Sequence, residues 1–357
     1  MGQIYEIRDR PSHIKLFLTS WLMSSFYRPK RLFSLVQPLR VISPIYHRAF
    51  RSSHAICKSL SHIGVAVHQG QKLSGPDRSP QLLKEHGLMK LIEDTGWKLR
   101  TDVDFTEILH PSLESAVSIN ARNHHSIGIN LEQVNSIVSQ SSKDDDFTLI
   151  IGGDHSISIG TIPALLSQRP DTGVIWVDAH ADINTPKTSP SGNIHGMSVA
   201  FLLGLVDTSS LPSFTWFKPC LKPQDLVYIG LRDLDAGEKD VLRKLGIKVF
   251  TMYEIDKYGI GEVMRQCVEH LKMPNIHLSY DIDALDPFFA PHTGTSVRGG
   301  LTFREGNYIC EALAETRRLR SMELVEVNPS LHTNLSIKST VDTALTLVGS
   351  ALGQQIL

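Results

Sequence analysis

Apolar runs of strand length alternate with longer amphipathic segments from about residue 62 to the end of this 357-residue chain. Such alternation is typical of an α/β fold with a mainly parallel central sheet and helices on both faces. We therefore predict a three-layer sandwich, with strands at 62–67, 148–153, 173–179, 226–230, 248–252, 276–283 and 322–328. The intervening segments predict helices near 111–141, 157–168, 236–245, 259–272, 303–318 and 337–353.

Acidic and imidazole side chains stand at the carboxyl ends of four predicted strands. His155 follows TLIIGGD, Asp178 follows VIWV, Asp281 and Asp283 follow IHLSY, and Glu326 follows MELV. In open α/β sheets, ligands bind beyond the carboxyl ends of the strands. These side chains, although far apart in the sequence, are therefore expected to converge at one end of the sheet.

The motif DAHAD places three potential metal ligands at alternate positions. Alternate residues of an extended strand share a face, so Asp178 and His180 can point at one centre, with Asp182 just beyond. Asp281 and Asp283 repeat this spacing. Four carboxylates so close together would raise one another's pKa values unless cations lay among them, so we expect two divalent ions. Carboxylate and imidazole ligands without thiolate favour manganese over structural zinc.

Each of these motifs also has a plain structural explanation. An isolated DxHxD or DxD motif is often a loop in which Asp side chains accept hydrogen bonds from nearby backbone amides. GGDH is also compatible with a tight turn in which Asp154 or Ser156 caps a helix and His155 is merely buried. Three such motifs at successive strand ends make the metal interpretation the stronger one.

The first 60 residues differ in charge from the rest of the chain. They contain ten Lys or Arg and two acidic residues, a balance of +8, whereas the remainder has 26 basic and 35 acidic residues, a balance of −9. No acidic residue occurs between Asp9 and Asp77. This composition is typical of a presequence for mitochondrial import, and the alternative is a disordered basic tail on a cytoplasmic protein. We expect an extension at 1–60 and a single domain at 61–357.

The composition excludes several other classes. A net charge of −1 is not that of a protein with a basic nucleic-acid-binding face. No stretch approaches the roughly 20 apolar residues that a membrane span needs. The cysteines are widely separated and form no CxxC pair, so neither a zinc knuckle nor a disulfide framework is indicated for Cys57, Cys220, Cys267 and Cys310.

Four motifs resemble, in the same order, those of the ureohydrolase family and of its arginases in particular. They are GGDHSISIG (152–160), WVDAHADINTPKTSPSGNIHGM (176–197), SYDIDALDP (279–287) and EVNP (326–329). GQKLSGPDRSP (70–80) is similar to the family's first loop, and YIGLRDLDAGE (228–238) is similar to its substrate loop. The resemblance therefore runs from about residue 62 to the C-terminus and implies an arginase-like catalytic domain.

The resemblance implies hydrolysis of L-arginine to L-ornithine and urea by a hydroxide that bridges two Mn²⁺ ions in each subunit. One ion would be held by His155, Asp178, Asp182 and Asp281. The other would be held by Asp178, His180, Asp281 and Asp283, so that Asp178 and Asp281 bridge the pair. The family also implies a homo-oligomer, and specifically a trimer.

The remaining site residues are carried over from the same motifs. The catalytic group would be His195 as proton shuttle, Glu326 as the residue that orients the guanidinium group, and the metal ligand Asp182. The α-carboxylate of the substrate would be bound by Asn184, Ser191 and Asn193. Near its α-amino group would lie Asp235 and Glu238, and Thr295 would line the same cleft.

Several alternatives stay open. The SxGNxHG loop favours arginine, which has an α-carboxylate, over agmatine, which has none, but another ureohydrolase acting on agmatine or a guanidino acid is the first alternative. A catalytically inactive metal-binding homologue is the second. A dinuclear phosphoesterase is disfavoured because GGD precedes DAH and Ile194 interrupts the GNH triplet. The departures from the family pattern are Ala181, Ala284, Ala236 and Arg298, and none of them removes a ligand. Arg298 and the altered first loop leave substrate affinity, and to a lesser degree specificity, open.

Overall fold

The computed structural model describes residues 58–110, 119–143, 146–331 and 336–354. These residues belong to one compact unit, Ala55–Leu357. The extension predicted at 1–60 lies outside the described residues except for 58–60, and part of the helix predicted at 111–141 also lies outside them.

An eight-stranded sheet, parallel in every strand pair, runs through the described part of the chain. Its strand order is β2-β1-β3-β8-β7-β4-β5-β6. The strands are β1 (Ser59–Ala66), β2 (Lys98–Thr106), β3 (Phe147–Gly152), β4 (Thr172–Val177), β5 (Leu226–Leu231), β6 (Lys248–Thr251), β7 (Asn275–Asp281) and β8 (Leu319–Val325).

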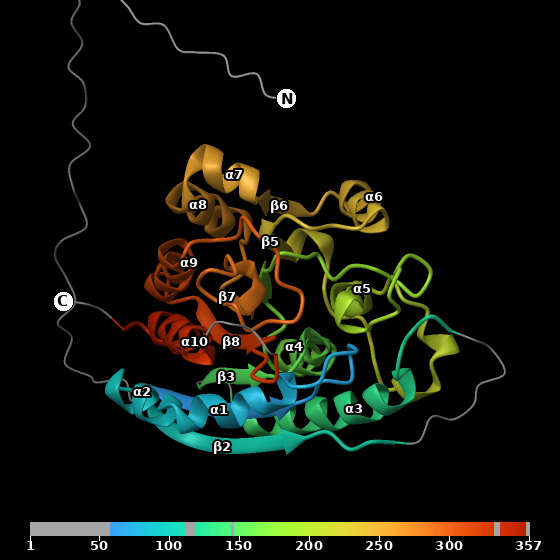
Figure 1. Ribbon diagram of the computed structural model, residues 1–357, viewed down its shortest axis with the longest axis horizontal. Coiled ribbons are helices and arrows are strands. Elements are labelled where there is room, and N and C mark those ends of the chain that lie inside the picture. Colours follow the sequence, from blue (N-terminus) through green and yellow to red (C-terminus); the bar gives the residue numbers. More distant parts are fainter. Residues whose placement is uncertain (1–57, 111–118, 144–145, 332–335, 355–357) are drawn as a thin grey trace, which may run out of the picture. The chain divides into compact units, whose positions relative to one another are not determined.

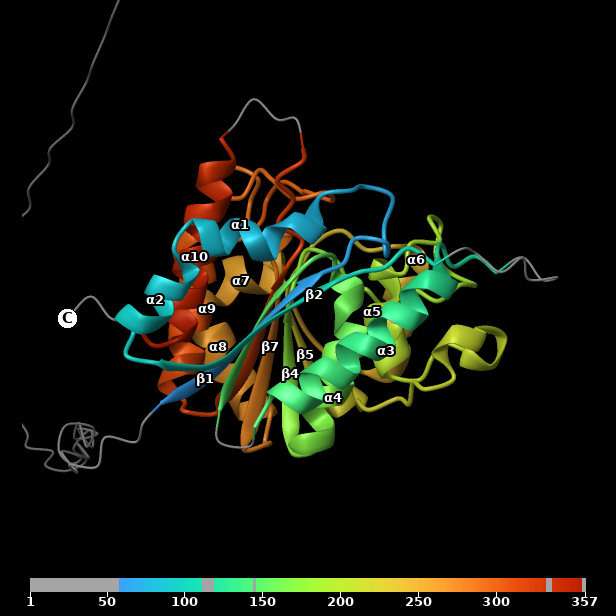
Figure 2. The same ribbon diagram turned by 90° about the horizontal axis from the view of Figure 1, so that it is seen from below.

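Helices cover both faces of this sheet, which confirms the predicted three-layer α/β architecture (Figures 1 and 2). One face carries α1 (Ser79–Glu85), α2 (Leu88–Asp94), α7 (Met252–Tyr258), α8 (Ile260–His270), α9 (Phe303–Glu315) and α10 (Ile337–Ala351). The other face carries α3 (His124–Ser141), α4 (Ser158–Gln168), α5 (Ser198–Leu202) and α6 (Ala236–Leu245). None of the described helices is long and apolar enough to cross a membrane.

The sheet separates two apolar cores. Along β4, Val174 and Trp176 join the core under α3, α4 and α5, whereas Ile175 and Val177 join the core under α8, α9 and α10. All four side chains are fully buried, and burying each contributes roughly 1.5–3 kcal/mol. A strand covered on both faces is apolar at most positions, which is why the run 174–177 of β4 could be recognised as a strand in the sequence.

The differences from the prediction lie at the periphery. Strand β2 was not predicted, because it is an edge strand with exposed charged residues at alternate positions, including Lys98, Arg100 and Asp102. Helices α1, α2 and α7 were not predicted either, since seven residues are too few to establish helical periodicity. The helix predicted from 111 begins at His124 in the structure.

The register brings the carboxyl ends of the four central strands level. Ile151 pairs with Leu324, Asp281 pairs with Val325, and Val177 pairs with Tyr280. The residues that follow β3, β8, β7 and β4 therefore lie side by side at one end of the sheet, as the sequence predicts.

Candidate metal and catalytic site

Three buried carboxylates surround one nitrogen of His155. Its Nδ1 lies 3.1 Å from Asp178 Oδ2, 3.2 Å from Asp182 Oδ2 and 3.2 Å from Asp281 Oδ2. Nδ1 makes no hydrogen bond to any of them. Four predicted ligands thus face a common centre, although they come from three separate strand ends.

A second group adjoins the first. His180 Nδ1 lies 3.0 Å from Asp283 Oδ2 and 3.4 Å from Asp178 Oδ1. Asp178 belongs to both groups, and within each of the triplets His155–Asp178–Asp182 and Asp178–His180–Asp283 the ligand atoms lie within 4.8 Å of one another. The structure therefore brings all six predicted metal ligands together.

The plain structural explanation of the motifs is also correct in part. Asp154 caps its turn by accepting a hydrogen bond from Ser156 N at 3.0 Å. Asp178 Oδ1 accepts from His180 N at 2.7 Å, and Asp281 Oδ1 accepts from Asp283 N at 2.8 Å. In Asp178 and Asp281 one oxygen thus anchors the local turn and the other, Oδ2, points at His155 Nδ1.

The electrostatics of the cluster indicate that positive charge belongs at its centre. Burial and neighbouring carboxylates raise the pKa of Asp281 well above its usual range and the pKa of Asp182 to about 6. Burial acts on Asp178 in the same direction, but His155 and His180 hold its pKa below the usual range. Contacts with carboxylates raise the pKa values of both histidines in spite of burial. Divalent cations would supply this positive charge, and oxygen and imidazole ligands suit manganese.

A buried hydrogen-bond chain orients His155. His155 Nε2 lies 2.8 Å from Ser279 Oγ, which donates to Glu323 Oε1 at 2.7 Å. Glu323 also accepts from Ser158 Oγ and Thr161 Oγ1, both at 2.6 Å. Because the Ser279 hydroxyl donates its proton to Glu323, its oxygen accepts a hydrogen bond from His155 Nε2–H. His155 Nδ1 is then unprotonated, and its lone pair is available to a metal. Glu323 was not among the predicted site residues, although an acidic residue inside an otherwise apolar strand is a signal for such a role.

His195 and Glu326 form a pair beside the predicted metal ligands. His195 Nδ1 lies 2.9 Å from Glu326 Oε1, which also accepts from His155 N at 2.9 Å. Gln71 Nε2 donates to the other oxygen, Oε2, at 2.6 Å. Burial lowers the pKa of His195, but the bond to Glu326 and nearby acids outweigh this and raise it to about 9. Gln71 was not among the predicted site residues.

Two site residues have strained backbones. Asp182 has φ 50° and Glu326 has φ 65°, both in the left-handed region that side chains with a Cβ disfavour. Each such residue costs roughly 1–3 kcal/mol, which the surrounding structure must offset. Asp182 O accepts from Val199 N and Glu326 N donates to Gly153 O, both at 2.9 Å, and these bonds hold the two conformations.

Three predicted substrate residues form one network between the loop after β4 and helix α6. Asn184 Nδ2 donates to Asp235 Oδ2 at 2.9 Å. Glu238 accepts from Asp235 N at 3.0 Å and from Ile183 N at 3.2 Å, one bond at each carboxylate oxygen. Burial raises the pKa of Glu238 to about 7. Glu238 therefore holds the two loops together.

The other three predicted substrate residues lie apart from this network. Ser191 Oγ accepts from Asn193 N at 3.1 Å, so these two residues share one turn. The side-chain oxygen of Asn193 is buried and has no hydrogen-bond partner among the described residues. Thr295 Oγ1 donates to Asp283 Oδ2 at 2.9 Å, which places it against a predicted metal ligand.

A model of the Arginase family matches residues 58–353. The chain belongs to the arginase family. Among proteins similar to it, "Arginase" of Glaciozyma antarctica is 44% identical over 315 residues, which cover 83% of this chain and 88% of that protein. "Arginase-2, mitochondrial" of Homo sapiens is 42% identical over 313 residues, covering 84% and 88%. The solved arginase of Bacillus caldovelox superposes with a TM-score of 0.78 at 38% identity, covering 84% of this chain and all of that one.

Membership of the arginase family makes the chain a hydrolase and confirms the resemblance seen in its motifs. The superposition on a solved arginase agrees with the α/β fold described above. The two His and Asp groups able to bind metal agree with the metal dependence expected of this family.

Proposed function

We propose that this chain hydrolyses L-arginine to L-ornithine and urea with two Mn²⁺ ions bound. The observation that carries the proposal is the meeting of six ligands in two groups that share Asp178, directly beside the His195–Glu326 pair. We propose the same roles for the ligands as the motifs imply, with Asp178 and Asp281 between the two ions. On family grounds we also propose a single catalytic domain at 61–357 and a homo-oligomer, specifically a trimer.

The chemistry needs a strong nucleophile at neutral pH. Two divalent ions here would lower the pKa of water from about 15.7 towards 7 and so provide hydroxide. The Glu326 carboxylate would orient the guanidinium group through charge-assisted hydrogen bonds, and Gln71 and the His155 amide hold that carboxylate in place. Because Glu326 engages Nδ1 of His195, Nε2 is the nitrogen that would hand a proton to the departing amine.

The substrate's amino-acid end would be bound by the loop after β4. Asn184, Ser191 and Asn193 offer amide and hydroxyl donors to the α-carboxylate. Asp235, whose side chain accepts from Asn184, would attract the α-ammonium group. Both oxygens of Glu238 already accept backbone amides, so we propose that Glu238 acts by positioning Asp235.

Urea release tests this function. The Mn²⁺-loaded chain is expected to release urea from L-arginine far faster than from agmatine, because agmatine cannot engage the carboxylate donors. Chelation should abolish the activity, and added Mn²⁺ should restore it. A preference for agmatine would indicate another ureohydrolase, and a fully metallated but inactive chain would indicate a metal-binding homologue; either result would overturn the proposal.

The Glu323→Gln variant tests the proposed role of His155 as a ligand. Glutamine puts an NH₂ group where Glu323 accepts hydroxyl protons, so Ser279 no longer fixes Nε2 as the protonated nitrogen. Mn²⁺ affinity at the His155 centre is expected to fall about 10- to 100-fold, as when an outer partner of a metal-binding histidine is lost. Metal content after dialysis against graded Mn²⁺ measures this. The exposed Glu132→Gln variant is the control, and equal affinity in both variants would contradict the role.

We infer that residues 1–60 direct the chain to mitochondria. Their +8 charge balance and the likeness of 84% of the chain to "Arginase-2, mitochondrial" of Homo sapiens support this inference. A fluorescent protein fused after residue 60 is expected to enter mitochondria. A matched fusion with Arg28, Lys30, Arg31 and Arg40 replaced by Gln should stay in the cytosol. A diffuse signal from the unaltered fusion would favour a simple basic tail.

A further inference from the structure

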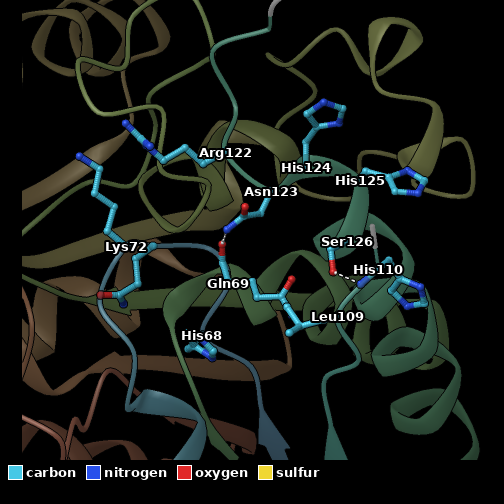
Figure 3. A pocket seen from close by; sticks show the side chains of 11 residues that line it. His68, Gln69, Lys72, Leu109, His110, Arg122, Asn123, His124, His125 and Ser126 are labelled. Carbon is cyan, nitrogen blue, oxygen red and sulfur yellow. Dashed lines mark hydrogen bonds between the residues drawn. The ribbon is translucent and has the colours of Figure 1, made fainter. Parts of the chain in front are cut away.

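A second pocket shares a wall with the catalytic site. It has a volume of about 640 Å³ and is lined by segment 68–72, by 109–110 and by the start of α3 at 122–126 (Figure 3). Segment 68–72 also faces the catalytic site, where Gln71 donates to Glu326 and Gly70 O accepts from His195 N at 3.1 Å. Among the proposed metal and substrate residues, none lines this pocket.

Basic side chains line the pocket, and two acidic residues, Glu107 and Asp77, lie behind it and pair with His68. The described lining residues include no Asp or Glu, whereas Lys72 and Arg122 are exposed and form no ion pair within the described part of the chain. Arg122 Nε donates to Ser191 O at 2.8 Å, which fixes the guanidinium group and leaves its two terminal nitrogens available. Figure 3 shows Lys72 and Arg122 on one side of the view and His124 and His125 on the other.

Buried donors without acceptors also line the pocket. Gln69 is 4% exposed, and its Nε2 has no hydrogen-bond partner among the described residues. The buried ring nitrogens His110 Nε2 and His124 Nδ1 are likewise without partners there. Buried polar groups in proteins are nearly always hydrogen-bonded, because an unsatisfied donor destabilises the folded state. Acceptor oxygens of a ligand would satisfy the Gln69 amide from the pocket side.

This lining selects the chemistry of a ligand. Two cations, of which Arg122 is held by its bond to Ser191, and an amide donor suit an anion rich in oxygen atoms. None of the described lining residues is acidic, so they offer the ammonium group of an amino acid no direct partner. Among the described lining residues Leu109 is the one aliphatic side chain, so these residues offer little apolar surface to a long acyl chain.

We propose that this pocket binds a compact oxyanion, inorganic phosphate or a small dicarboxylate, through Lys72, Arg122 and Gln69. The anion would lie against segment 68–72, in which Gln71 donates a hydrogen bond to Glu326 and Gly70 O accepts one from His195 N. The site is separate from the proposed metal centre, and its occupancy does not depend on the proposed hydrolysis.

Calorimetric titration of the Mn²⁺-loaded full chain tests the proposal, with phosphate in one arm and succinate in the other at constant ionic strength. At least one anion is expected to bind saturably and to raise the unfolding temperature. In Gln69→Met, which keeps the length of the side chain, and in Lys72→Gln, affinity should fall at least about tenfold. Lys244→Gln, an equal charge change at an exposed residue of α6, should bind like the wild type.

The unfolding temperature of Gln69→Met without anion gives a second measurement. Removing an unsatisfied buried amide should leave this temperature unchanged or raise it, while the anion-dependent rise disappears. The anion that binds more tightly, phosphate or succinate, shows whether the pocket prefers a phosphate or a carboxylate group. If neither anion binds, or if both pocket variants bind like the wild type, the pocket proposal is overturned. If the anion binds at the metal pair instead, its binding would persist in both variants. The titration measures binding without arginine turnover, so its outcome is separate from that of the proposed hydrolysis.

Discussion

The Asp281→Asn variant is expected to lose the metal pair and nearly all hydrolysis, while its metal-free form becomes more stable than the metal-free wild type. Burial and the charges of Asp283 and Asp178 raise the pKa of Asp281 well above its usual range. A raised carboxyl pKa contributes stability that is present below the unfolded pKa and is lost as pH rises through the folded pKa. An Asn side chain cannot ionise, so at neutral pH the metal-free variant does not lose this stability.

The substitution is conservative in shape but not in charge. The carbonyl oxygen of the introduced side-chain amide would still accept a hydrogen bond from the Asp283 backbone amide, so the turn after β7 is kept. One negative charge between the two proposed metal centres disappears, and metal affinity should fall by more than about 100-fold, beyond the effect of losing an outer hydrogen-bond partner.

Metal analysis, urea release and calorimetry of the metal-free protein together measure the effects of Asp281→Asn. Asp256→Asn, at an exposed position of α7, controls for the loss of a negative charge far from the site. A variant that keeps both ions and the wild-type rate would refute the proposed bridging position of Asp281. A lower unfolding temperature without metal would contradict the electrostatic argument.

The His195→Ala variant is expected to turn over arginine about 10²- to 10⁴-fold more slowly, which is the usual contribution of a general acid or base. Its Mn²⁺ content should not change, because the imidazole contacts Glu326 and belongs to neither ligand group. The pH–rate profile of the wild type should contain an ionisation that the variant lacks. His270→Ala, at the exposed end of α8, is the control.

Metal analysis and kinetics of one preparation separate the two roles open to His195. Loss of metal together with activity would make His195 a ligand. Unchanged turnover with full metal content would mean that another group protonates the departing amine.

The central sheet and the meeting of the six proposed ligands at one end of it were predictable from sequence for the same physical reason. A parallel sheet buried on both faces requires continuous apolar strands, and polar residues that directly follow such strands must lie at its carboxyl end. Asp178 directly follows β4, whose second half is a continuous apolar run, and Asp281 is the last residue of β7. Edge strand β2 escaped prediction because one side of it meets solvent, and the seven-residue helices escaped it because they are short.

The supporting residues of the site were not predictable in this way. Gln71 and Glu326 are far apart in sequence, and nothing in the loop GQKLSGPDRSP indicates which side chain reaches the carboxylate. Glu323 lies within β8, and the sequence alone does not show which groups bind its buried carboxylate. Glu238 was assigned to substrate, but its oxygens accept two backbone amides, a role that depends on how α6 is placed.

The strand order has a consequence for how the protein is made. Strands β3 and β4 follow one another in the chain, yet β8 and β7 lie between them in the sheet. A nascent chain that has left the ribosome only as far as β6 therefore lacks the middle of its sheet. It holds His155 and the DAHAD motif but no Asp281 or Asp283. Such long-range insertion is slow, so the six proposed ligands can meet only late, after synthesis of the C-terminal quarter.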